Sequence, residues 1–160
     1  MSDPAQHSGF GQHPVEGSGA GTFNPDQRGL AGFWIRFGAR FIDGLVLALV
    51  GLVLRLLFGQ SAASGLANLV AVAYFTYFHA QPAGQSLGDR VAGIRVVDAD
   101  SGGSIDYIRA FIRWIVSLVS GFVLLIGYFW MLFNDRKQTW HDMAARTLVV
   151  RTRQYPAPTS

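Results

Sequence analysis

Two apolar stretches, GLVLALVGLVLRLLF at residues 44–58 and SAASGLANLVAVAYFTYFHA at residues 61–80, decide the fold of this 160-residue chain. The second stretch has no formal charge, and the first has only Arg55. A helix needs about 20 apolar residues to cross a bilayer. The first span therefore takes residues from its N-terminal flank and covers about 40–58. Only two residues separate the stretches, so we expect a tight turn between two antiparallel membrane helices.

A third apolar stretch, WIVSLVSGFVLLIGYFWMLF at residues 114–133, is also uncharged and has aromatic residues near its ends, as membrane spans often do. The composition agrees with a membrane protein, because 50% of residues are apolar and 14% are charged. Soluble domains carry about 25% charged residues. The predicted fold class is an all-α membrane protein with three transmembrane helices, over about 40–58, 61–80 and 114–133.

The remaining segments are predicted to include both disordered tails and an ordered loop. Residues 1–31 are rich in glycine and proline and have no hydrophobic period, which predicts a disordered polar tail. We expect the membrane domain to cover residues 32–152, and residues 153–160 to form a frayed C-terminal tail. The polar loop 81–113 is predicted to be ordered, with a small β element.

Within this loop, GIRVVD at residues 93–98 has the β-branched residues of a short strand and is followed by the turn-forming ADSGG. Ser104 or Asp106 is placed to cap a helix that begins near Tyr107. After the third apolar stretch, the sequence predicts a short helix around His141–Arg146 and a short strand at TLVV.

Charged residues at the entry to the first span are the strongest candidates for a functional site. Arg36, Arg40 and Asp43 are four, three and seven positions apart, so they share one helix face. A charge at membrane depth costs roughly 2.5–3.5 kcal/mol on insertion scales and is usually paired or faces a polar cavity. Two interpretations stay open: an ion pair that lines a polar path, or a pair that only orients the helix while Arg36 reaches the headgroups. We interpret Arg109 and Arg113 as headgroup contacts.

The sequence offers no catalytic constellation. His79 has no obvious Asp partner, and His141 and Asp142 are adjacent on a predicted helix, so they point to different faces and lack further metal ligands. The absence of cysteine excludes disulfides and thiolate ligands. No basic stripe with interleaved aromatic residues favours nucleic acid. We therefore expect no enzyme, no cofactor, no metal site and no nucleic-acid partner.

Three segments together resemble the RDD family of bacterial integral membrane proteins. They are GFWIRFGARFID at 32–43, GQSLGDRVAGIRVVDADSG at 84–102 and DRKQTWHDMAARTLVV at 135–150. By position, the resemblance puts the arginine of the family on Arg36 and its two aspartates on Asp43 and Asp142.

The chain departs from the family pattern in places. Arg146 stands where the family commonly has glycine. The resemblance implies an integral membrane location, and it gives modest support to transport, which has been proposed for some members.

Basic residues near the spans bear on the topology. The hairpin puts the N-terminal flank and loop 81–113 on one side, and their arginines make that side cytoplasmic by the positive-inside rule. A third crossing then exports the basic C-terminal flank, and we favour this arrangement. In the alternative, the third segment is re-entrant and bends near Gly121–Gly127. That alternative returns Asp142 to the side of Arg36 and lets TLVV pair with GIRVVD.

The leading functional hypothesis is a multi-pass protein of the bacterial plasma membrane that acts as a small transport or permeation component for ions or small solutes. Three spans rarely enclose a pathway, so we expect a homo-oligomer or another membrane-protein partner in the lipid bilayer. In this hypothesis Asp43 binds or relays a cation or proton, Arg36 tunes its charge, and Asp142 pairs with a basic residue, with Arg40 and Arg113 in support. The alternative is a non-transporting scaffold whose loop and C-terminal tail dock a partner while the ion pairs hold the helices together.

Overall fold

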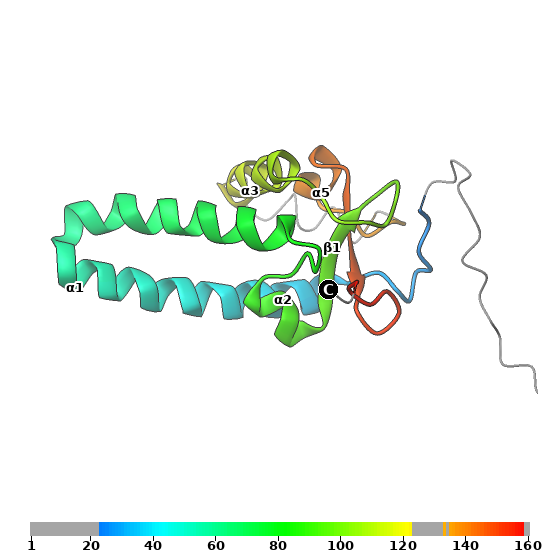
Figure 1. The fold of residues 1–160 in the computed structure, drawn as a ribbon, viewed down its shortest axis with the longest axis horizontal. Coiled ribbons are helices and arrows are strands. Elements are labelled where there is room, and N and C mark those ends of the chain that lie inside the picture. Colours follow the sequence, from blue (N-terminus) through cyan, green and yellow to red (C-terminus); the bar gives the residue numbers. More distant parts are fainter. Residues whose placement is uncertain (1–22, 123–132, 134, 159–160) are drawn as a thin grey trace, which may run out of the picture.

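The computed structural model describes residues 23–122, 133 and 135–158. In chain order, its elements are α1 (Phe33–Ala80), α2 (Leu87–Ala92), β1 (Ile94–Asp98), α3 (Tyr107–Phe122), α5 (Trp140–Ala144) and β2 (Thr147–Arg151). Figure 1 shows a long helical hairpin formed by α1, with the other elements gathered at its open end. We call the described parts of residues 23–32 and 81–158 the cap. The fold is mostly helical with one small sheet.

The α1 hairpin turns at Gly59, whose φ of 77° and ψ of 169° interrupt the helix. A φ in this region favours glycine, because glycine has no Cβ. The turn separates residues 33–58 from residues 60–80, so each half has the about 20 residues that a bilayer crossing needs. The predicted tight turn and antiparallel pair are confirmed (Figure 1). Among the described residues, α1 is the one helix that is long and apolar enough to cross a membrane.

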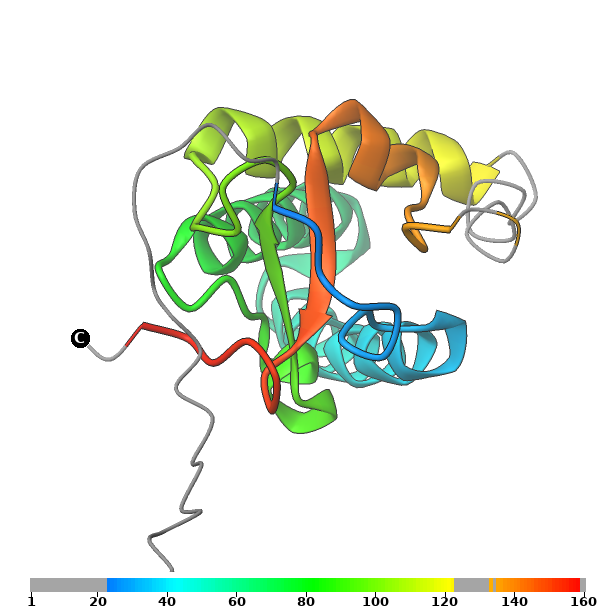
Figure 2. The same ribbon diagram turned by 90° about the vertical axis from the view of Figure 1, so that its right-hand side faces the viewer.

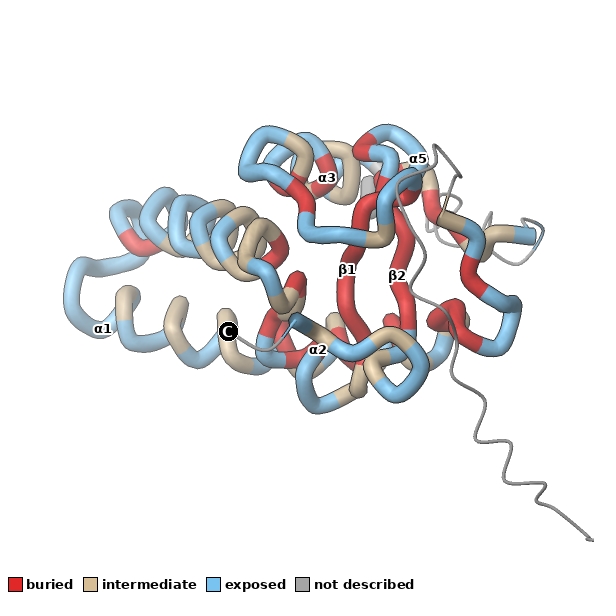
Figure 3. Tube along the Cα trace, turned by 45° about the vertical axis from the view of Figure 1, so that its right-hand side comes forward, coloured by how far each residue is buried: buried red, intermediate tan, exposed pale blue. Residues whose placement is uncertain are grey.

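The hairpin leaves its apolar side chains uncovered. Large hydrophobic residues along α1 are exposed, among them Leu45, Leu49, Leu52, Leu56 and Leu69. Figure 3 shows the distal hairpin almost entirely exposed or intermediate, whereas the two strands are buried. Apolar patches of this extent are rare on the surface of soluble monomers and mark contact with a membrane or a partner.

The two strands form an antiparallel sheet in which Val96 lies opposite Val149. One face of the sheet carries Val96 and Val149 and packs on the base of the helices, and the other carries Val97 and Leu148 in a second apolar cluster. Alternate residues of a strand point to opposite faces, so both faces can be covered at once. The predicted strands at GIRVVD and TLVV are therefore confirmed, and so is the ordered loop.

The ends of the described chain cover the second face of the sheet. Leu30 forms a β-bridge with Val150, and Phe23 packs edge-on against Tyr155 with ring centroids 5.4 Å apart. The prediction of a disordered tail over residues 1–31 was therefore wrong for residues 23–31, and the frayed tail from residue 153 is ordered at Tyr155. The apolar residues Phe23, Leu30 and Tyr155 explain both corrections, because they bury against the strands. Residues 1–22 lie outside the described residues.

The third membrane helix is not confirmed. Helix α3 begins at Tyr107, where Asp106 accepts a hydrogen bond from the backbone N–H of Arg109 at 2.8 Å, as the capping prediction expected. Figures 1 and 2 together show that α3 runs across the hairpin rather than along it. The rest of the predicted span, residues 123–132, lies outside the described residues. The pairing of β1 with β2 brings together the segments before and after this span, as the re-entrant alternative expected.

Candidate functional site

Charged and imidazole side chains converge where the open end of the hairpin meets the cap. We call this set the ion network. Its members are Arg36, Arg40, Asp43, His79, Asp89, Arg113, His141 and Asp142. They come from both halves of α1 and from α2, α3 and α5. All except Arg40 are buried. The three residues that the sequence singled out, Arg36, Asp43 and Asp142, all belong to the network.

Asp142 is the centre of one half of the network. Its carboxylate is fully buried and forms ion pairs with Arg36 and Arg113, and one of its oxygens also accepts a hydrogen bond from the backbone N–H of Thr139 at 3.1 Å. Burial alone raises the pKa of Asp142, but the two guanidinium groups outweigh it and hold the pKa well below its usual range. Asp142 is therefore ionised, and its charge is neutralised by arginines from two helices, α1 and α3.

The guanidinium of Arg36 makes three interactions. Besides Asp142, it donates to the carbonyl oxygen of Ala31 at 3.0 Å and to that of Lys137 at 2.7 Å. Arg113 also donates to the hydroxyl of Thr147 at 2.8 Å. The interpretation of Arg113 as a headgroup contact was wrong, because this side chain is buried against α5 and β2.

Asp43 is held by a different set of donors. Its buried carboxylate accepts hydrogen bonds from the hydroxyl of Ser86 at 2.7 Å, the hydroxyl of Tyr74 at 2.8 Å and the backbone N–H of Gly88 at 2.8 Å. Arg40, one turn earlier on the same helix, lies 3.6 Å from it. These four partners use the main lone-pair directions of the carboxylate. The predicted local pair of Arg40 with Asp43 is present, and the remaining partners come from the other half of α1 and from α2.

Gly88 is where α2 touches the hairpin. A Cβ at this position would collide with the carbonyl oxygen of Ala39 and lie 2.9 Å from the carboxyl carbon of Asp43. The backbone N–H of Gly88 can reach Asp43 only because no side chain keeps the two elements apart. The glycine of the SLGD segment thus fixes the position of α2 on α1.

Sequence reasoning missed the pair formed by His79 and Asp89, whose ring Nε2 and carboxylate oxygen are 3.1 Å apart. Asp89 also closes a capping box with Ser86, the first residue of SLGD. Burial raises the pKa of Asp89, but the hydrogen bond from His79 and the charge of Arg40 lower it well below its usual range. In the sequence, the Ser-x-x-Asp spacing at the start of α2 was a signal for the capping box, and so for an ordered position of Asp89.

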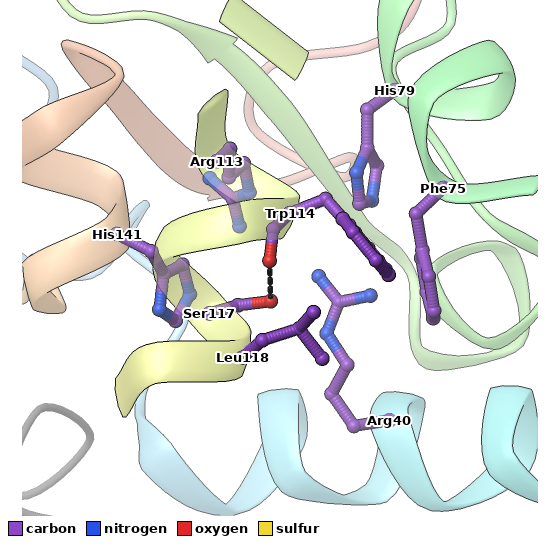
Figure 4. A pocket seen from close by; sticks show the side chains of 8 residues that line it. All are labelled: Arg40, Phe75, His79, Arg113, Trp114, Ser117, Leu118 and His141. Carbon is purple, nitrogen blue, oxygen red and sulfur yellow. Dashed lines mark hydrogen bonds between the residues drawn. The ribbon is translucent and has the colours of Figure 1, made fainter. Parts of the chain in front are cut away.

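A cavity of about 130 Å³ lies beside the ion network (Figure 4). Its lining residues come from the hairpin, α3 and α5: Arg40, Phe75, His79, Arg113, Trp114, Ser117, Leu118 and His141. Burial lowers the pKa of His141 to about 3, although Asp142 opposes this effect, so the imidazole is neutral at pH 7. The positive charge at the cavity wall therefore comes from the two arginines.

Within the described residues, no group of three or more His, Cys, Asp or Glu side chains could hold a metal ion. The site contains histidine and aspartate, but its aspartates are already engaged by arginine, serine, tyrosine and histidine. The arrangement can stabilise the junction of hairpin and cap, and its cavity can accept a small polar molecule.

A sequence model of the RDD family matches residues 30–146, a range that contains every member of the ion network. The chain belongs to the RDD family. The resemblance seen in the three segments is therefore confirmed, with Arg36, Asp43 and Asp142 inside the matched range. No solved structure matches this RDD protein.

Several bacterial proteins are similar over most of the chain. The uncharacterized membrane protein YteJ of Bacillus subtilis is 30% identical over 142 residues, which cover 78% of this chain and 83% of the relative. The uncharacterized protein YckC of the same organism is 29% identical over 126 residues, 74% of this chain and 83% of the relative. The uncharacterized protein YxaI of that organism is 23% identical over 147 residues, 75% of this chain and 96% of the relative.

Proposed function

We propose that this RDD protein resides in the bacterial plasma membrane, with the α1 hairpin across the bilayer and the cap at the cytoplasmic face. The length and exposed leucines of the hairpin support this location, as do the family and the name of the relative YteJ. Pairing of β1 with β2 supports a cap whose loop and C-terminal part share one side. Helix α3 then lies along the membrane surface, since it crosses the hairpin direction (Figure 2).

The lack of cysteine allows a direct test of this topology. Single cysteines at Ser61 near the hairpin turn, at Ser101 in the loop and at Gln154 near the C-terminus all fall on exposed positions. In intact cells, an impermeant thiol reagent should label only the Ser61 position, and the other two should react after permeabilisation. Labelling of Gln154→Cys in intact cells would instead support three crossings.

We propose further that the protein is a small transport or permeation component for ions or small solutes, without enzymatic activity. The observation that supports this function is the cavity beside Arg40 and Arg113 at the end of a hairpin that is otherwise apolar. Ionisable groups at the edge of a membrane are costly and commonly mark solute or ion paths. Ion pairs that served only to join helices would not need a cavity among them.

One hairpin cannot surround a pathway, so we propose a homo-oligomer as the transporting unit. The exposed hydrophobic residues along both halves of α1 give it lateral surfaces for further copies. On one of these surfaces, a Cβ added to Gly44 would meet no described atom within 4 Å, so another helix could approach closely.

Flux measurements in proteoliposomes test this function with matched variants on one helix. Ser117 lines the cavity, whereas Val119 is 58% exposed on the other side of α3. Purified protein should carry at least one of K⁺, Na⁺, H⁺ or inorganic phosphate faster than empty liposomes. Ser117→Leu should reduce that flux to the level of empty liposomes, because it fills the cavity without removing a charge. Val119→Leu should transport like the wild type.

A second candidate function is the non-transporting membrane scaffold, and the four partners of Asp43 favour it. A carboxylate with these contacts holds elements together and has little capacity left for a passing cation. In this candidate, Asp43→Asn lowers the melting temperature in detergent, and every variant, like the wild type, shows the flux of empty liposomes. Flux above that of empty liposomes, lost in Ser117→Leu, would rule the scaffold out.

A further inference from the structure

The described residues that line the cavity include arginine and histidine side chains but no aspartate or glutamate. Arg40 and Arg113 contribute guanidinium groups, and His79 and His141 contribute imidazoles. The acids of the ion network do not line the cavity, although Asp43 pairs with Arg40, and Asp142 pairs with Arg113. Figure 4 shows the arginines and imidazoles surrounding one space. The side chains that face the cavity therefore offer cationic hydrogen-bond donors and no carboxylate.

Two buried side chains at this wall have hydrogen-bonding atoms with no partner in the described part of the chain. They are Nε of Arg113, which is 3% exposed, and Nδ1 of His79, which is 1% exposed. Buried polar groups in folded proteins are nearly always hydrogen-bonded. The Nε–H of Arg113 is a charged donor, which suits an anion. Nε2 of His79 faces a carboxylate that can only accept, so Nδ1 of the neutral ring is an acceptor.

From these groups we infer that the cavity binds a phosphate-type anion with a protonated oxygen, such as hydrogen phosphate or a phosphomonoester. Arg40 and Arg113 hold the charged oxygens, and Nδ1 of His79 accepts the hydrogen bond of the P–OH group. This inference names the solute class of the site proposed above and rests on that proposal for the role of the site. The cavity volume of about 130 Å³ exceeds the about 30 Å³ of one water molecule.

The phosphate group in the cavity has two candidate sources, a free phosphate ion or the headgroup of a phospholipid, because the cavity also has apolar walls. Phe75, Trp114 and Leu118 line it next to the charged groups, and Arg40 lies over the ring of Phe75 at 4.7 Å from its centroid. A free phosphate would use only the polar wall, whereas the headgroup of an anionic phospholipid would also place carbon atoms against these three side chains.

Equilibrium binding to the full-length protein in detergent tests the inference separately from transport. Inorganic phosphate should raise the melting temperature at constant ionic strength set with chloride, and sulfate should act more weakly because it offers no P–OH proton. In a second arm, phosphatidic acid in nanodiscs is compared with phosphatidylcholine. Stabilisation by phosphatidic acid alone would identify the lipid headgroup as the source, and stabilisation by free phosphate would identify a solute.

Variants decide whether the effect arises in the cavity. Arg40→Gln should weaken binding of the stabilising phosphate compound about tenfold, the loss of one charge-assisted contact. Ser117→Leu keeps every charge and should abolish binding by filling the space, whereas Val119→Leu should bind like the wild type. The inference is overturned if neither phosphate nor phosphatidic acid stabilises the wild type, or if Ser117→Leu responds equally. Equal stabilisation by sulfate would overturn the role of His79.

The binding experiment and the flux experiment can contradict the two proposals separately. Phosphate binding without flux of any solute would overturn the transport function and leave the anion site standing. Flux of a cation in protein that shows no phosphate response would overturn the anion site and leave transport standing.

Discussion

Two segments of the cap, residues 86–98 and 139–151, are built on the same local plan. Their sequences are SLGDRVAGIRVVD and TWHDMAARTLVVR. Each begins with a capping box, Ser86 with Asp89 in one and Thr139 with Asp142 in the other. Each continues as a short helix, turns at a residue with positive φ, and ends in a five-residue strand. The two strands pair with each other, and the equivalent residues Val96 and Val149 lie opposite one another.

The two segments differ in what their aspartates contact. Asp89 pairs with one imidazole, that of His79 on α1. Asp142 pairs with two guanidinium groups, Arg36 on α1 and Arg113 on α3. The same backbone motif therefore serves two kinds of junction. The α2 segment joins the cap to the hairpin through the pair of Asp89 with His79 and the hydrogen bond from Gly88 to Asp43. The α5 segment joins hairpin and α3 through Asp142 and its two arginines.

The largest effect expected from this difference follows Asp142→Asn. The substitution preserves shape but leaves two buried arginines without their counter-charge, which costs about 3–5 kcal/mol. We expect a large fall in melting temperature in detergent, and loss of the α3 and α5 contacts to the hairpin. Tryptophan fluorescence can follow the change, since Trp114 and Trp140 lie in α3 and α5.

Acid titration provides the control for Asp142. Its pKa is lower in the folded than in the unfolded chain, so its stabilisation is complete above the unfolded value of about 3.9 and is lost as the pH falls through the folded value. The wild type and Asp142→Asn should therefore differ fully at pH 7, and the difference should begin to shrink below about pH 4 and keep shrinking as the pH falls further. A difference that persisted unchanged in acid would contradict the charged centre.

Asp89→Asn should have a smaller effect, of about 1.5 kcal/mol, because the amide can still accept from the N–H of Ser86 and face His79. The melting temperature should fall less than in Asp142→Asn, measured in the same detergent. If both variants lost equal stability, the distinction between an aspartate paired with one imidazole and an aspartate paired with two guanidinium groups would be wrong.

Much of this architecture follows from local sequence patterns. Apolar length and the two-residue link predicted the hairpin, and β-branched runs predicted both strands. Helical spacing correctly grouped Arg36, Arg40 and Asp43 on one side of α1. These features depend on residues close together in the chain, for which periodicity is informative.

The features that local patterns left open or misjudged depend on contacts between distant segments. Arg36 reaches Asp142, which is 106 positions away, and no spacing rule connects them. Arg113 was interpreted as a headgroup contact, because hydropathy does not reveal that α5 packs against it. The same limit applies to the third apolar stretch, since hydrophobicity alone does not distinguish a helix across the bilayer from one that lies along it. The paired SLGD and TWHD motifs were visible in the sequence as capping boxes.

The smallest predicted effect concerns the residue that links each helix to its strand. Gly93 has a φ of 66° and Arg146 has a φ of 50°, a region where a Cβ costs about 1 kcal/mol. The resemblance described above places glycine at the position of Arg146, and glycine adopts this conformation without strain. Arg146→Gly should therefore stabilise the protein by up to about 1 kcal/mol, while Gly93→Ala should destabilise it by about the same amount. A Cβ on Gly93 would meet only the hydroxyl of Thr152 at 3.6 Å, so backbone strain dominates the cost. Melting temperatures that moved in the same direction for both substitutions would show that the two turns are not equivalent.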